Sequence, residues 1–266
     1  MAGGRYSLRG EATDPGRRVL LGGALALAGG QLTSVSNALA FGEEGAFHAR
    51  ILSMNPQVIP EEVSAARRWA WELTRRTSAP GRLSAQTIRP SSAALLREPF
   101  CVWSGKTDPG TLDNRAIRKL RQYLRMGGMM VVDDRDPHSG KFGAGVRREL
   151  ARVVPDAGIV RLPKEHVLFK TYYILDAPAG RLQGPAQIEA IVRGKTAQVI
   201  FLSHDLMGAL ARKGESWAHA MESGGGEARE QAIRFSINIA MYVLCSDYKD
   251  DQVHAPFLMR RRHKKR

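Results

Sequence analysis

The chain has 266 residues, of which 43% are hydrophobic and 25% are charged. This composition is ordinary for a folded globular protein and excludes a largely disordered chain. The formal net charge of +14 is concentrated at one end, because residues 260–266 carry six Lys or Arg side chains. The remainder is only mildly basic, which argues against a nucleic-acid-binding surface on the body of the protein.

The first 40 residues have the pattern of an export signal. The pair Arg17-Arg18 precedes an uncharged run over 19–30, and Ala38 and Ala40 form an A-x-A terminus. The run is shorter than the ~20 apolar residues that span a bilayer, and the segment resembles a twin-arginine (Tat) signal. We therefore expect transport by the Tat translocase to the periplasm or cell envelope, with the signal cleaved after Ala40 or retained as an anchor. A chance arginine pair before an Ala-rich helix is the alternative.

Residues 41–248 are expected to form a single α/β domain. The clearest unit is an apolar strand over 100–103, a helix that starts near 111–114 and ends at Gly127-Gly128, and a second apolar strand over 129–132. Apolar runs of this kind around a helix predict parallel strands in a doubly wound, flavodoxin-like sheet with helices on both faces. The other predicted elements are strands over 47–52, 86–88 and 159–162 and helices over 60–77, 142–154 and 227–245.

Two further strands, over 188–192 and 198–202, flank a Gly194-Lys195 turn and predict a hairpin at one sheet edge. Cys101 and Cys245 lie in apolar surroundings and are expected to be buried free thiols. Residues 249–266 are interpreted as a basic extension.

The basic end of that extension, Arg260 to Arg266, suits an anionic membrane surface or an acidic envelope polymer. A solvated tail that only aids solubility is the alternative.

Candidate site residues follow three apolar strands. They are Ser104 and Gly105, Asp133 and Asp134, and His204 and Asp205. Ligands of open parallel sheets bind beyond the carboxyl ends of the strands. If the three strands are neighbours, these side chains converge into one ligand-binding cleft.

The carboxylates of Asp133 and Asp134 could bind a hard cation or share a proton. Successive strand residues point to opposite faces, however, so one of them could instead cap the next helix while another pairs with Arg135. His204 could act as a base with Asp134 as its partner, although a lone His at a strand end is more often structural. The chain lacks the G-x-S-x-G, P-loop, G-x-G-x-x-G and H-E-x-x-H patterns, and we predict no cofactor.

Several segments together resemble the family called domain of unknown function 4159, over roughly residues 46–246. They include 47–51, 99–105, 120–128, 147–150, 162–169 and 203–206, and the most specific block runs from Tyr123 to Asp134. The resemblance implies a bacterial, exported or membrane-attached protein with a fold similar to class I glutamine amidotransferases, and no established activity.

In those amidotransferases the corresponding strand ends in a catalytic Cys, whereas here it ends in Asp133-Asp134. Thiol-based glutamine hydrolysis is therefore not expected, although His204 lies near the position of the amidotransferase His. The sequence favours a non-catalytic binding module of the cell envelope with a protein partner. The alternatives are a periplasmic hydrolase that uses Asp134 and His204, with or without a divalent cation, and nucleic-acid binding through the tail.

Overall fold

The computed structural model describes residues 45–55 and 57–263, with side chains described as far as Ser246. The predicted signal residues Arg17, Arg18, Ala38 and Ala40 lie outside this part of the chain, as do the side chains of the basic tail. Within the described residues, no helix combines the length and apolar character needed to cross a membrane.

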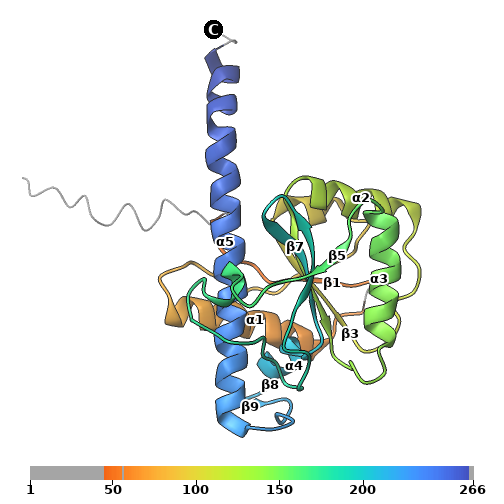
Figure 1. Cartoon of the computed structure of the whole chain (residues 1–266), viewed down its shortest axis with the longest axis vertical. Coiled ribbons are helices and arrows are strands. Elements are labelled where there is room, and N and C mark those ends of the chain that lie inside the picture. Colours follow the sequence, from red (N-terminus) through yellow and green to blue (C-terminus); the bar gives the residue numbers. More distant parts are fainter. Residues whose placement is uncertain (1–44, 56, 264–266) are drawn as a thin grey trace, which may run out of the picture. The chain divides into compact units, whose positions relative to one another are not determined.

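A seven-stranded sheet forms the centre of the domain, in the order β2-β1-β3-β4-β7-β6-β5 (Figure 1). The first five strands in this order run parallel, and β6 and β5 are antiparallel to their neighbours. The parallel part has the flavodoxin-like arrangement. The strands are β1 (Arg50–Leu52), β2 (Thr87–Ile88), β3 (Phe100–Gly105), β4 (Met129–Asp134), β5 (Ile159–Arg161), β6 (Glu189–Arg193) and β7 (Thr196–Leu202).

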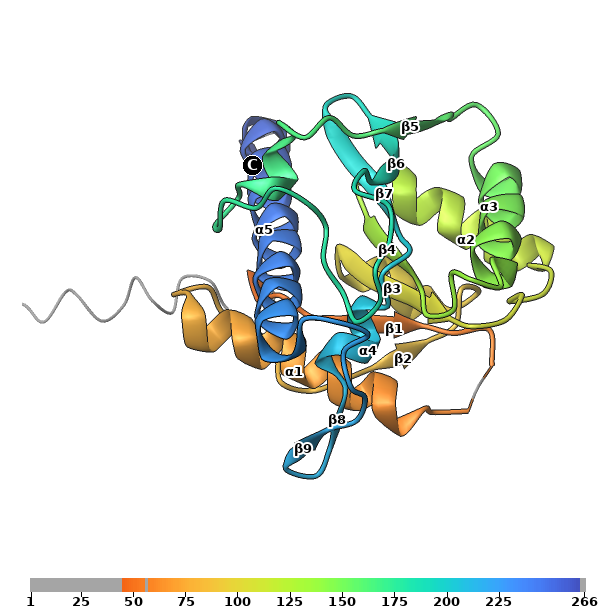
Figure 2. The ribbon, with the colours of Figure 1, turned by 60° about the horizontal axis from the view of Figure 1, so that its bottom comes forward.

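Helices cover both faces of the sheet, which confirms the predicted doubly wound α/β fold (Figure 2). One core contains apolar side chains of α1 (Pro60–Arg76), α4 (Leu206–Leu210) and α5 (Gly225–His263). The other contains those of α2 (Asn114–Arg125) and α3 (Lys141–Val153). The smaller elements are the 3₁₀ turns Ala93–Arg97 and Val167–Phe169 and a hairpin of β8 (Arg212–Lys213) and β9 (Ser216–Trp217).

The α2–β4 connection shows how local sequence fixes this architecture. Asp113 is the N-cap of α2, and its Oδ1 accepts a 2.6 Å hydrogen bond from the Ala116 N–H. Gly127 ends the helix with a φ of +92°, a region that favours glycine. A Cβ at Gly128 would lie 2.5 Å from the Tyr123 ring, so this position also requires glycine.

The two tryptophans of α1 take different environments, as helical spacing predicts. Trp69 is fully buried, and its Nε1 donates a 2.7 Å hydrogen bond to the Ser236 carbonyl of α5. Trp71 is half-buried, with the Arg68 guanidinium 4.0 Å from its ring centroid.

Arg50 in β1 is an unexpected core residue with 0% exposure. Its guanidinium donates to four backbone carbonyl oxygens, those of Ala94, Leu95, Glu98 and Phe100. Alternation along 47–52 predicted a strand but gave no indication that its polar side chains would be buried. The arginine therefore ties the segment before β3 to the sheet.

Three details differ from expectation. The β6–β7 hairpin exists, but β7 lies inside the sheet next to β4, and β5 forms the edge. The predicted helix over 227–245 continues to His263. Cys101 is buried as expected, whereas Cys245 is an exposed free cysteine, so the prediction of a second buried thiol was wrong.

Candidate functional site

The three candidate segments converge at the carboxyl ends of neighbouring strands. Ser104 of β3 is the register partner of Asp133 in β4, and Asp133 is in turn opposite Leu202 of β7. His204 and Asp205 follow directly after β7. The expected convergence is therefore present, because β3, β4 and β7 are adjacent and parallel.

Asp133 is completely buried beneath the first residues of α4. Its two carboxylate oxygens accept hydrogen bonds of 2.9 and 2.8 Å from the backbone N–H groups of Leu206 and Met207. Burial, together with the nearby Asp205 carboxylate, raises the pKa of Asp133 to about 7. Both oxygens are thus used to hold α4 against the sheet.

Asp205 is the N-cap of α4 and the only non-glycine residue with positive φ (+50°) among those described. Asp tolerates this left-handed region better than most residues. Its Oδ1 accepts a 2.8 Å hydrogen bond from the Gly208 N–H, and its carboxylate forms ion pairs with Arg135 and Arg181. A Cβ at Gly208 would lie 2.1 Å from Asp205 Oδ2, so the tight turn requires a glycine there.

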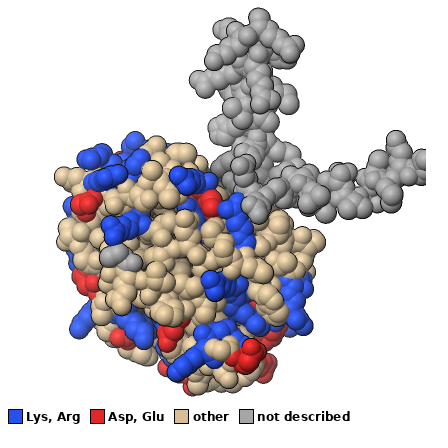
Figure 3. Space-filling model, turned by 180° about the vertical axis from the view of Figure 1, so that it is seen from behind, with Lys and Arg blue, Asp and Glu red and all other residues tan. Residues whose placement is uncertain are grey.

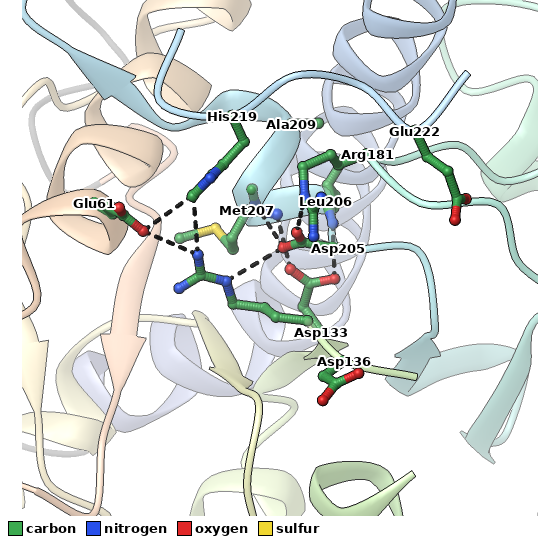
Figure 4. Close-up of polar contacts among 12 residues, drawn as sticks. Glu61, Asp133, Asp136, Arg181, Asp205, Leu206, Met207, Ala209, His219 and Glu222 are labelled. Carbon is green, nitrogen blue, oxygen red and sulfur yellow. Dashed lines mark hydrogen bonds and ion pairs between the residues drawn. The ribbon is translucent and has the colours of Figure 1, made fainter. Parts of the chain in front are cut away.

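Arg135 connects this turn to α1. Its Nε lies 3.3 Å from Asp205 Oδ1, its Nη2 lies 3.2 Å from Glu61 Oε2, and its Nη1 lies 3.7 Å from Glu62 Oε1. His219 contacts the same Glu61 oxygen at 3.1 Å. Figure 4 shows Glu61 and His219 on one side of this cluster and Asp133, Arg181 and Asp205 on the other.

We call this cluster the strand-end ion network. Its members are Glu61, Glu62, Asp133, Arg135, Arg181, Asp205 and His219. They come from five separate parts of the chain, which is why the candidate site residues predicted from the sequence included only Asp133 and Asp205 of this network. The one local signal was Arg135, which directly follows the paired aspartates.

Asp134 belongs to the opposite face of the sheet, as strand alternation predicts. Its Oδ1 accepts a 3.0 Å hydrogen bond from the Asp136 N–H, and its Oδ2 accepts one of 3.1 Å from the Gly143 N–H in the first turn of α3. Burial raises the pKa of Asp134. The two adjacent aspartates therefore hold the beginnings of two different helices, α4 and α3.

His204 is 4% exposed, and burial lowers its pKa. Its Nδ1 and the Ser104 Oγ are buried without a hydrogen-bond partner. The His204 side chain lines a pocket of about 500 Å³ beyond the carboxyl end of β7. The charged side chains that also line this pocket are Arg147, Arg161 and Glu189.

The metal chemistry of the site is limited by these contacts. In the described part of the chain, no group of three or more His, Cys, Asp or Glu side chains is arranged to hold a metal ion. Asp133 and Asp134 each already accept two backbone N–H groups. The arrangement is suited to fixing helix positions around a pocket.

The fold and this site define a doubly wound α/β domain whose strand-end charges are buried and paired. The sequence profile of the family described as domain of unknown function 4159 (DUF4159) matches residues 49–244. The chain therefore belongs to this family, and the matched region contains every strand of the central sheet and all the candidate site residues. No curated protein matches the sequence.

Proposed function

We propose that this protein is an exported, non-catalytic binding module of the bacterial cell envelope. The observation that carries the proposal is the state of the strand-end carboxylates. Asp133, Asp134 and Asp205 are 0%, 4% and 1% exposed, and their oxygens accept backbone N–H groups or pair with arginine. A catalytic carboxylate must reach its substrate, and these groups are enclosed.

The pocket beside His204 offers a place for a ligand. It lies beyond the carboxyl end of a parallel strand, where ligands of such sheets bind. Its two arginines, Arg147 and Arg161, favour a small anionic ligand, although Arg147 also pairs with Glu189 at 2.6 Å. We also propose that the domain is related in fold to the class I glutamine amidotransferases. The order of the parallel strands, β2-β1-β3-β4-β7, supports this relationship.

The proposed location in the cell envelope is supported by the export-signal pattern of the first 40 residues. The proposed attachment to an anionic membrane or an acidic polymer is supported by the basic residues Arg260 to Arg266. Nucleic-acid binding has less support. On the face shown in Figure 3, Lys and Arg side chains are scattered among acidic and uncharged residues and do not form one continuous basic patch. A nucleic-acid surface normally gathers its basic side chains in a patch or stripe.

A periplasmic hydrolase remains the second candidate. Burial raises the pKa of Asp134 toward the neutral range, and it lowers the pKa of His204, which keeps the imidazole uncharged and able to accept a proton. Asp134 lies close to Arg147, a residue that lines the same pocket as His204. A divalent cation could assist such a centre.

Thermal unfolding with a panel of divalent cations tests the metal-dependent form of the hydrolase candidate against the non-catalytic proposal. We expect Ca²⁺, Mg²⁺, Mn²⁺ and Zn²⁺ to leave the unfolding midpoint unchanged in the wild type, in Asp134→Asn and in the control Asp136→Asn. A cation that raises the midpoint in the wild type and the control but not in Asp134→Asn would identify a metal site by linkage. That result would overturn the non-catalytic reading.

Export is tested separately. Replacement of both Arg17 and Arg18 by Lys in a tagged full-length chain is expected to retain the protein in the cytoplasmic fraction, with the wild type in the periplasmic or membrane fraction. Equal distribution of both proteins would contradict Tat export.

A further inference from the structure

One edge of the seven-stranded sheet is formed by the short strand β5, and the other edge is β2. β5 ends the strand order and pairs only with β6. All three of its residues are exposed, including Ile159 at 40% and Val160 at 47%. Ile159 lies opposite Ile191 and Val160 lies opposite Ala190, so apolar side chains occupy both faces of this edge.

An edge strand presents unpaired backbone N–H and C=O groups that can accept another strand. Many proteins protect such an edge with charged side chains or a covering helix. In β5 the only charged residue is Arg161 at its end, and in the views of Figures 1 and 2 no helix lies over the strand's outer side. The backbone of β5 is thus available for pairing.

A groove of about 680 Å³ lies next to this edge. It is formed between the sheet and the carboxyl-terminal ends of α2 and α3. Apolar side chains make up much of its lining, namely Leu124, Val153, Val154, Val160, Ile191 and Val192.

Three arginines line the same groove without carboxylate partners. The Arg121 guanidinium donates to the carbonyl oxygens of Arg152 and Val153, and the Arg193 guanidinium donates to that of Leu124. Arg125 is exposed, and its guanidinium forms no ion pair with any described carboxylate. Asp156 is the single acidic residue of the lining, which leaves an excess of positive charge.

We propose that β5 and this groove bind an extended, acidic segment of a partner protein. The segment adds a strand to β5, places apolar side chains in the groove and directs its carboxylates to Arg121, Arg125 and Arg193. Backbone pairing supplies affinity in this mode of recognition, and side-chain pockets supply specificity. The inference rests on the proposed binding function and names the partner's chemistry.

Charge selects this occupant over a second copy of the chain. Edge-to-edge pairing of two β5 strands would bring the arginines of one groove toward those of the other, and like charges destabilise such contacts. An acidic strand instead meets complementary charge. Because β5 has only three residues, backbone pairing alone is short, and the groove and its arginines must provide the remaining affinity.

The test uses full-length protein and a fluorescein-labelled seven-residue peptide in which Val alternates with Glu. We expect saturable binding by fluorescence anisotropy that weakens with added salt. The Lys-for-Glu peptide should not bind. Arg125→Glu is expected to weaken binding by about fivefold or more, which corresponds to ~1 kcal/mol.

Arg115→Glu is the matched control, because Arg115 is an exposed arginine of the same helix that does not line the groove. It lies ten residues earlier, about 15 Å along the helix axis. Equal loss of affinity in both variants would reduce the effect to net charge and would overturn the proposal.

Two further arms test the strand and the occupant. Peptides N-methylated at alternate residues, in both registers, remove the N–H groups of one edge, and at least one register should lose binding. Full binding by both would overturn strand addition. A dimer in sedimentation that dissociates on Val160→Lys would make a second copy the occupant and would also overturn the proposal. If no peptide binds, β5 and its groove are not a docking surface for an acidic segment. If the cation panel also finds no metal site at Asp134, the proposed binding function is still not contradicted.

Discussion

Replacement of Asp133 by Asn should change how stability depends on pH. The unfolded chain loses this proton near pH ~3.9, whereas the folded protein keeps it up to about pH 7. Between these values the native state binds more protons, so stability falls as pH rises, by up to ~1.4 kcal/mol per pH unit. The contribution is fully present below the unfolded pKa and is lost as the pH rises through the folded pKa.

From pH 5 to pH 7 the loss of stability amounts to ~2 kcal/mol, because Asp133 stays mostly protonated over this range and is half-ionised only at about pH 7. Asn does not titrate, so the variant lacks this component. Urea unfolding at several pH values, followed through the fluorescence of the buried Trp69 and Trp103, measures the difference between the two slopes.

The slopes of the wild type and Asp133→Asn must be compared, because other titrating groups change stability with pH in the opposite direction. Burial lowers the pKa of His204, so its contribution is present above the unfolded pKa of ~6.5 and is lost as the pH falls through the lower folded value. Asp136→Asn removes the same formal charge three residues away and should keep the wild-type slope. Identical slopes for the wild type and Asp133→Asn would refute the raised pKa and the enclosure of Asp133 on which it rests.

Three further outcomes are expected. Gly128→Ala should lower the free energy of unfolding by about 1–3 kcal/mol, because its Cβ would overlap an aromatic ring. Gly158→Ala is the control and should be close to neutral, because a Cβ there meets nothing within 4 Å. Similar losses in both variants would contradict the steric argument. Arg50→Lys should lower the free energy of chemical unfolding by about 2–5 kcal/mol, because an ammonium cannot reach four carbonyl acceptors and leaves buried carbonyls unpaired. A loss below about 0.5 kcal/mol would contradict this role of Arg50. Ellman's reagent should modify Cys245 in the native protein and Cys101 only after unfolding. Cys101 is buried, and burial raises the pKa of its thiol to about 11, so little reactive thiolate forms. Fast modification of both cysteines in the native protein would show that the core opens.

The β3–α2–β4 unit could be predicted because its signals are local. An apolar strand, the Asp113 cap, a helical stripe and Gly127-Gly128 follow one another in the sequence, and each restricts the backbone within a few residues. The same continuity made the adjacency of the strand ends after β3 and β4 predictable. Parallel pairing then placed Ser104 beside Asp133.

The helix α4 could not be predicted in this way. It has five residues, and its position depends on the Asp133 carboxylate, 73 residues away from Leu206 in the sequence. The arginines that neutralise Asp205 come from the end of β4 and from the loop before β6. Arg50 was missed for a similar reason, because its carbonyl acceptors lie more than 40 residues later. Composition and periodicity carry no information on such distant partners.

The position of β7 has a consequence for how the chain is made. This strand lies between β4 and β6, yet it is formed by residues 196–202, about three quarters of the way along the sequence. Until those residues leave the ribosome, β4 has an open edge, and Asp133 has no helix to hold. A nascent chain or truncated product that ends earlier therefore exposes a parallel edge that is prone to aggregation. The central sheet therefore cannot be completed until about three quarters of the chain has been made.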